Sequence, residues 1–261
     1  MEWIEALILG LIQGLTEFLP VSSSGHLEIG KHLLGVEARE SLMFTVAVHG
    51  ATVLSTIVVF RHDLAEIISG TLKFQWNKET KYVFYIMLSM VPVAIIGLFF
   101  KDNVEQFFGG ENLVFVGAML LVTSALLAFA HFWRSGKREI KPGNAFVIGI
   151  AQAFAVLPGI SRSGATISTG LLLGVDKKRI ARFSFLMVLI PILGENFLDL
   201  VSGEMTANSE IGTLPLLVGF VAAFLSGWLA CRWMINIVKR GKLIWFAVYC
   251  VVVGSIAIIA G

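Results

Sequence analysis

Six long apolar stretches constrain the fold of this 261-residue chain more than any other feature. A helix needs about 20 apolar residues to cross the hydrocarbon core of a membrane. Charged residues make up only 15% of the chain, whereas about a quarter of the residues of a soluble domain are charged. The pattern predicts an all-helical integral membrane protein with spans at 42–60, 82–100, 113–133, 181–201, 214–236 and 243–260.

Two further apolar stretches are interrupted before they reach spanning length. They begin at residues 3 and 144, and each meets a proline and a tract of serine and glycine before a second short apolar piece follows. A polar group without a partner in hydrocarbon costs several kcal/mol, so such tracts at membrane depth must line a wet cavity. We therefore expect two re-entrant helical hairpins, over 3–35 and 144–175.

The basic residues are distributed unevenly between the predicted loops. If both hairpins return to the side from which they enter, fifteen Lys and Arg residues share one face, in the loops 61–81, 134–143, 176–182 and 237–242. Only three lie on the opposite face. Because Lys and Arg concentrate in cytoplasmic loops, this bias predicts that the basic face is cytoplasmic and that both termini lie outside.

The two predicted hairpins resemble each other in sequence. GLIQGLTEFLPVSSSGH begins at residue 10 and GIAQAFAVLPGISRSGA at residue 149, and five positions are identical at this offset of 139 residues. Since one hairpin would enter from each side, the repeat would be inverted, as in many transporters whose ligand site lies between the repeats. We expect one membrane domain, 1–261, with a first repeat over about 1–133 and a second over about 144–261.

The tip of the first hairpin combines groups that bind anions with groups that could react. Gln13 and Glu17 are four residues apart and share one face of the incoming helix, which Pro20 terminates. The serines after Pro20 stand where the N-cap of the next helix belongs, and free N–H groups at a helix start bind anions. The candidate residues of this tip are Gln13, Glu17, Ser22, Ser23, Ser24, Gly25 and His26.

The tip of the second hairpin, PGISRSGAT, repeats this anion cradle and adds an arginine in the place of Ser23. An arginine at bilayer depth is costly and marks a partner or a substrate path, and its guanidinium binds phosphate bidentately. One tip could then supply reacting groups and the other an electrostatic clamp, which favours phosphoryl chemistry. The candidate residues of this tip are Ser161, Arg162, Ser163, Gly164 and Thr166.

Structural roles stay open for several of these side chains. The serines could be helix caps alone, and His26 could be a packed interior histidine. Glu17 and Arg162 could form a buried ion pair, although such pairs often add little net stability. His49 lies in an apolar run and could face the same cavity, but no motif supports it.

QGLTEFLPVSSSGH and LPGISRSGATIS resemble the two signature regions of the bacterial undecaprenyl-diphosphatase family, also called the bacitracin-resistance protein family. The first region of that family is an (E/Q)xxxE motif followed by PVSSxGH, and the second is PGxSRSGxT. Gln13 takes the glutamine form of the first motif, so one acid stands there and not two. The resemblance extends over essentially the whole chain in size, span order and motif spacing.

This resemblance implies hydrolysis of undecaprenyl diphosphate to undecaprenyl phosphate and inorganic phosphate. Such activity recycles the lipid carrier for peptidoglycan synthesis, supports cell-wall biogenesis and cell shape, and confers bacitracin resistance. The resemblance also implies a divalent cation, Mg²⁺ or Ca²⁺, which Glu17 would hold together with substrate phosphates. The site would open to the outer side of the bacterial cytoplasmic (inner) membrane; a homodimer fits the family, and no nucleic-acid partner is expected.

The residues of the two tips suggest how the reaction would run. We expect Ser23 to be the nucleophile, Glu17 or His26 its base or proton carrier, and Arg162 the group that stabilises charge on the transferring phosphoryl group. A water that attacks directly, with Glu17 on the metal, is the alternative route.

Two other functions are compatible with parts of this sequence. A transporter or flippase of a phosphorylated polyprenyl lipid would use the same tips only for binding. A type-2 phosphatidic acid phosphatase would need a nucleophilic histidine after its Ser-Arg motif, but all five histidines precede Arg162. The second rival is therefore weak.

Overall fold

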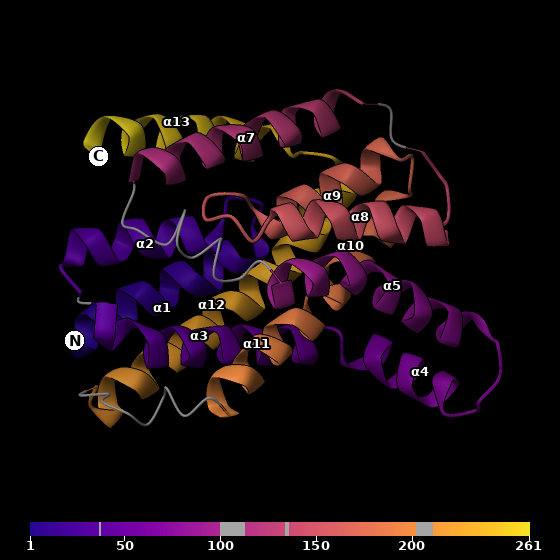
Figure 1. The fold of residues 1–261 in the computed structure, drawn as a ribbon, viewed down its shortest axis with the longest axis horizontal. Helices are drawn as coiled ribbons and strands as arrows, with labels where there is room; N and C mark the ends of the chain where they lie inside the picture. The colour runs from indigo at the N-terminus through magenta and orange to yellow at the C-terminus, as the bar shows by residue number, and fades with distance from the viewer. Residues whose placement is uncertain (37, 100–112, 134–135, 202–210) are drawn as a thin grey trace.

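The computed structural model describes residues 1–36, 38–99, 113–133, 136–201 and 211–261, which fold into an all-helical bundle (Figure 1). The all-helical part of the predicted fold class is thereby confirmed. The helices are α1 (Trp3–Phe18), α2 (Ser23–Leu34), α3 (Ala38–Val59), α4 (Arg61–Thr71), α5 (Lys78–Phe99), α7 (Leu113–Phe132), α8 (Pro142–Phe154), α9 (Arg162–Leu172), α10 (Lys177–Met187), α11 (Leu189–Val201), α12 (Thr213–Arg240) and α13 (Ile244–Ala260).

Both predicted helical hairpins form. The helices α1 and α2 pack against each other, as do α8 and α9. Leu19, the C-cap of α1, has an extended backbone with ψ of 144°, which is the conformation that a following proline favours. The chain reverses over residues 19–22 in the first hairpin and over 155–161 in the second.

Within the described ranges, three helices are long and apolar enough to cross a membrane: α5, α7 and α12. A fourth span is available if the bent pair Met43–Val59 and Arg61–Thr71, which turns by 77°, counts as one crossing. Among the described residues α13 is a shorter apolar helix. These helices are typical of a multi-pass membrane protein, and the described part of the chain holds three to four candidate spans.

The predicted span 181–201 is not a single helix. The structure divides it at Val188 into α10 and α11. Pro191 explains the break, because a proline has no N–H and leaves the carbonyl of Met187, four residues earlier, without its helical partner.

The four predicted basic loops meet at one end of the bundle. Backbone hydrogen bonds join residue 138 to residues 174 and 176, an ion pair of 2.7 Å joins Arg182 to Asp63, and His131 Nδ1 lies 3.0 Å from the Gly241 carbonyl. Both chain termini lie at the opposite end, on the left of Figure 1. The described parts of these loops therefore lie close together, and their position on one face of a membrane stays a prediction.

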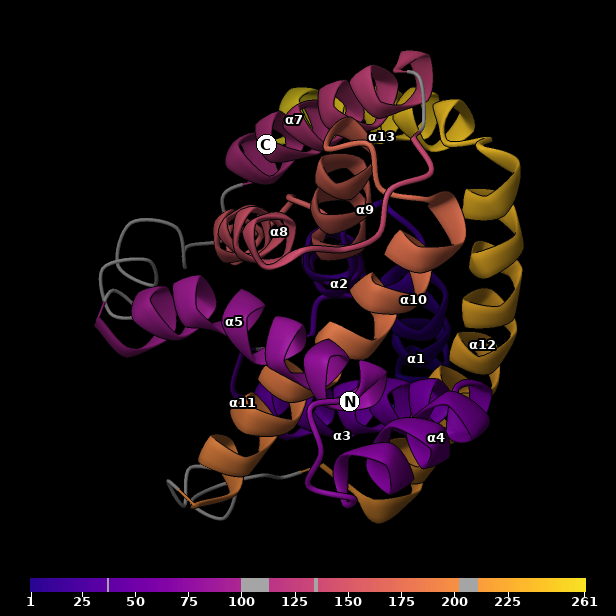
Figure 2. The same ribbon diagram turned by 90° about the vertical axis from the view of Figure 1, so that its right-hand side faces the viewer.

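Small residues allow the first helix of each hairpin to pack closely against a neighbouring helix. A Cβ at Gly10 would collide with the backbone of Gly219 on α12, and one at Gly149 would collide with the backbone of Ser89 on α5. Such small-residue contacts are typical of helices that pack in membranes. Figure 2 shows the resulting bundle, with α7 and α13 side by side along its upper edge.

Candidate functional site

The tips of the two hairpins touch each other inside the bundle. The Ser163 hydroxyl donates a hydrogen bond of 3.2 Å to the carbonyl of Leu19 in the other tip. A Cβ at Gly25 would lie 3.3 Å from the Cα of Gly159, so this glycine permits close contact between the tips. The structure therefore joins two sequence motifs that lie about 140 residues apart.

Each tip ends in a serine that caps the following helix. Ser22 Oγ accepts a hydrogen bond of 3.3 Å from the Gly25 N–H, and it lies 3.3 Å from Ser24 Oγ. The same two contacts recur 139 residues later around Ser161, at 3.1 and 3.4 Å. The predicted N-caps are confirmed as Ser22 and Ser161, which leaves Ser23 in the first turn of α2 with its hydroxyl free for another contact.

Ser23 uses that hydroxyl to bind Glu17. Ser23 Oγ donates a hydrogen bond of 2.7 Å to Glu17 Oε2, and Gln13 Nε2 donates one of 2.9 Å to the same oxygen. The Glu17 side chain is only 8% exposed. A hydroxyl within hydrogen-bond reach of a buried carboxylate has the geometry of a nucleophile and its base.

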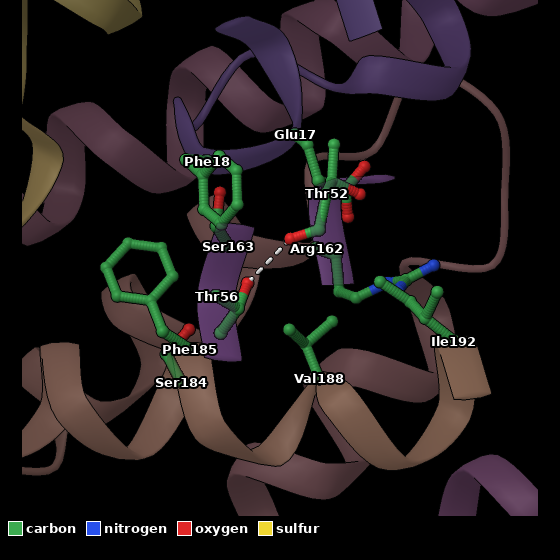
Figure 3. Close-up of a pocket in the computed structure, with 10 residues that line it drawn as sticks. All are labelled: Glu17, Phe18, Thr52, Thr56, Arg162, Ser163, Ser184, Phe185, Val188 and Ile192. Atoms are coloured by element: carbon green, nitrogen blue, oxygen red, sulfur yellow. Dashed lines mark hydrogen bonds between the residues drawn. The ribbon is translucent and has the colours of Figure 1, made fainter. Parts of the chain in front are cut away.

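A small cavity lies beside Glu17 (Figure 3). Its polar side includes Glu17, Arg162 and Ser163, and its apolar side includes Phe185, Val188 and Ile192. The cavity has a volume of about 20 Å³, which is room for about one water.

Arg162 reaches the cavity from α9 with an incomplete set of hydrogen bonds. Its Nη1 is buried and has no hydrogen-bond partner among the residues that the structure describes. The Arg162 charge acts on the buried Glu17 carboxylate, but that interaction leaves the Nη1 donor unsatisfied. Because burying a donor without a partner is unfavourable, this guanidinium is suited to bind an anion that enters the cavity.

The structure does not bring all of the predicted site residues to the cavity. His26 has both ring nitrogens in other contacts: Nδ1 lies 2.8 Å from the Ser22 carbonyl and Nε2 lies 2.8 Å from the hydroxyl of Tyr249. Thr166 is buried and lies 2.6 Å from Ser184 Oγ, so it links α9 to the cavity wall on α10.

Sequence reasoning considered His49 on α3 but missed the two threonines that continue its polar face. His49 Nε2 lies 4.0 Å from Glu17 Oε2, and Thr52 and Thr56 line the cavity. Thr56 donates a hydrogen bond to the Thr52 carbonyl, drawn as a dashed line in Figure 3. The three residues are spaced i, i+3 and i+7 and therefore share one face of a helix. This polar face on an otherwise apolar helix is the sequence pattern that could have identified them.

The fold and the site define a class of protein: a helical membrane protein with a part-buried Glu–Ser pair beside an arginine that has a buried, unsatisfied N–H donor, where two hairpin tips meet. A family model described as bacitracin resistance protein BacA matches residues 6–256. This chain belongs to that family, as its two motifs predicted.

Curated relatives named undecaprenyl-diphosphatase match this chain along its length. The relatives from Bacteroides fragilis and Parabacteroides distasonis are each 58% identical to it, over 99% of this chain and 98% of theirs. The relative from Korarchaeum cryptofilum is 40% identical over 97% of both chains.

Proposed function

We propose that this protein is an integral-membrane lipid diphosphatase that hydrolyses undecaprenyl diphosphate to undecaprenyl phosphate and inorganic phosphate. Full-length relatives that carry this activity in their name support the proposal. The observation that carries it in this chain is the 2.7 Å contact between Ser23 Oγ and Glu17 Oε2, next to a cavity shared with Arg162. Recycling of the lipid carrier would make the protein a contributor to peptidoglycan synthesis and to bacitracin resistance.

The covalent route follows from this geometry. Glu17 accepts the proton of Ser23 while Ser23 Oγ attacks the terminal phosphorus and forms a P–O bond. The anhydride bond breaks, undecaprenyl phosphate leaves, and a water then hydrolyses the phosphoserine to release inorganic phosphate. Arg162 stabilises the charge on the transferring phosphoryl group, because positioning and electrostatics dominate such reactions.

Direct attack by water is the second route, and one feature of the cavity favours it. The free volume beside Glu17 holds about one water, which Glu17 could deprotonate in place of Ser23. A phosphoserine forms only on the covalent route, so trapping it distinguishes the two.

The remaining candidate residues would bind and place the diphosphate. The two helix starts at Ser22 and Ser161 present backbone N–H groups and hydroxyls, which suit phosphate oxygens. Gln13 orients Glu17 through its hydrogen bond. The proposed substrate-binding residues are Gln13, Ser22, Ser24, Gly25, Ser161, Ser163 and Gly164. Thr166 would act indirectly, because its hydroxyl is hydrogen-bonded to the Arg162 carbonyl and to Ser184.

The donor chemistry near Glu17 fits a divalent cation that arrives with the substrate. No group of three His, Cys, Asp or Glu side chains suited to a metal occurs in the described part of the chain. Gln13 Oε1 is buried without a partner among those residues, and oxygen ligands suit Mg²⁺ and Ca²⁺. We propose that Glu17 and Gln13, with substrate phosphate oxygens, hold the ion, which would neutralise phosphate charge when bound.

An inverted repeat with re-entrant hairpins would account for the contacts between the two hairpin tips. At the offset of 139 residues, Pro20 corresponds to Gly159 and Gly25 to Gly164. Gly25 faces Gly159 and Gly164 faces Pro20, the reciprocal contacts that a two-fold axis between the tips requires. In Figure 1, α1 and α2 extend from the end that carries the termini, and α8 and α9 extend from the opposite end.

This repeat gives a single domain over residues 1–261 with about six crossings. The crossings would be α3, α5, α7, the broken pair α10 and α11, α12 and α13. The basic end would face the cytoplasm of a bacterial inner membrane, and the site would open to the outer side. A homodimer is part of the proposal.

A flippase for the same lipid is the second candidate function, because inverted repeats with broken helices recur in transporters. Purified protein in detergent distinguishes the two, since flipping needs a bilayer and hydrolysis does not. We expect inorganic phosphate to be released from undecaprenyl diphosphate in detergent. Lipid movement in liposomes without phosphate release in detergent would contradict the enzymatic proposal.

A further inference from the structure

A second polar cluster lies outside the cavity and joins α2 to α13. The His26 ring stacks on the Tyr249 ring, with centroids 5.5 Å apart and planes within 12°. His26 Nε2 lies 2.8 Å from the Tyr249 hydroxyl, and His26 Nδ1 lies 2.8 Å from the Ser22 carbonyl. No role suggested by the motifs includes Tyr249.

The partners of His26 determine which nitrogen carries the proton. A carbonyl oxygen can only accept a hydrogen bond, so His26 Nδ1 carries the hydrogen. The neutral ring then has an unprotonated Nε2, which accepts the hydrogen bond of the Tyr249 hydroxyl. Both ring nitrogens of His26 are therefore used in hydrogen bonds to Ser22 and Tyr249. Ser23 donates its hydrogen bond to Glu17 and not to His26.

The carbonyl that His26 holds belongs to an unusual turn. Ser22 has φ of 69° and ψ of 99°, and Phe74 is the other non-glycine residue with positive φ in the described ranges. Backbones of this kind persist only where their surroundings enforce them. The backbone N–H and the ring Nδ1 of His26 both bind the Ser22 carbonyl, at 3.2 and 2.8 Å.

We propose that Tyr249 and His26 are positioning residues that hold the Ser22 turn and thereby direct Ser23 toward Glu17. Ser23 follows Ser22 directly, so the backbone angles of Ser22 determine where its hydroxyl points. Tyr249 fixes the orientation of the His26 ring, and the ring fixes the carbonyl. This inference rests on the proposed diphosphatase function.

Removal of one hydroxyl tests the first contact. Tyr249→Phe keeps the ring stack and removes the hydrogen bond to His26. We expect kcat for phosphate release from undecaprenyl diphosphate to fall about tenfold because Ser23 loses its alignment, and KM to change by less than kcat because the second tip and Arg162 stay in place. Tyr82→Phe on α5 is the matched control, since its hydroxyl has no hydrogen-bond partner among the residues that the structure describes.

Two His26 variants then separate positioning from proton transfer. His26→Asn places an amide N–H where Nδ1–H stood and should retain at least tenfold more activity than His26→Ala. Tyr249→Phe should cause no further loss in either background, because coupled residues are not additive. Equal inactivity of the Asn and Ala variants, or a full tenfold loss from Tyr249→Phe in both backgrounds, would overturn the proposal.

A spectroscopic measurement does not depend on activity. Nitrogen-15 shifts of labelled histidine, with the His26 signal assigned through His26→Asn, should show a proton on Nδ1 and change in Tyr249→Phe. A proton on Nε2 would refute the arrangement even if the enzyme were active. Wild-type protein that released no phosphate, but showed the expected shifts, would contradict the proposed function alone.

Discussion

Shortening Glu17 by one methylene tests the contact on which the proposed chemistry depends. In the structure Glu17 Oε2 lies 2.7 Å from Ser23 Oγ. One C–C bond is about 1.5 Å, so Glu17→Asp would lengthen this separation to about 4.2 Å, beyond hydrogen-bond reach. The negative charge near Arg162 stays in the cavity, so the charge balance of the site is kept.

The expected loss of activity follows from the role of a general base. A positioned base contributes about 10²–10⁴-fold, which corresponds to about 2.7–5.4 kcal/mol in the activation free energy. Phosphate release by Glu17→Asp in detergent should fall in this range, while its thermal unfolding midpoint should stay near that of wild type.

Glu28→Asp is the matched control for this substitution. Glu28 lies on α2 and pairs with Lys31, outside the cavity. It loses the same methylene, so we expect its turnover to stay within about twofold of wild type. A folded Glu17→Asp protein with turnover within threefold of wild type would refute the assignment of Glu17 as the base.

Three further predictions address the clamp, the cation and the topology. Arg162→Lys should lower kcat by about 10²–10³-fold, because a point charge cannot reproduce the bidentate guanidinium; near-normal turnover would show that Arg162 is structural. EDTA should abolish phosphate release, and calorimetry with Mg²⁺ should show no tight binding until a substrate analogue is present; tight binding to free protein would contradict the shared site. In intact cells an impermeant thiol reagent should label Thr213→Cys and not Lys141→Cys, since both native cysteines are buried; the reverse pattern would overturn the orientation.

Local rules were sufficient to predict the elements that hold the site. Pro20 ends α1, and Ser22 and Ser161 cap the helices that follow, because capping and proline effects act over a few residues. The break at Val188 was equally local, since Pro191 marks it, but hydropathy averaged over the whole stretch conceals it.

Contacts between distant helices could not be read from the sequence. His49 and Thr52 face Glu17 only because α3 packs beside α1. Tyr249 lies 223 residues from His26, and no motif includes it. The packing of the helices determines which face of an apolar helix contacts which neighbour. A helix that is apolar on all sides has no sequence pattern that predicts this contact.

A trapped phosphoserine would be direct evidence that Ser23 is the nucleophile. Wild-type protein would be mixed with undecaprenyl diphosphate labelled in its terminal phosphate, quenched in acid within one turnover, and digested for mass spectrometry. We expect label on the peptide that contains Ser23 and no label in Ser23→Ala, whose turnover should fall by at least about 10³-fold while it still binds the lipid. If Ser23→Ala released phosphate at the wild-type rate and neither protein carried a phosphoserine, Ser23 would not be the nucleophile.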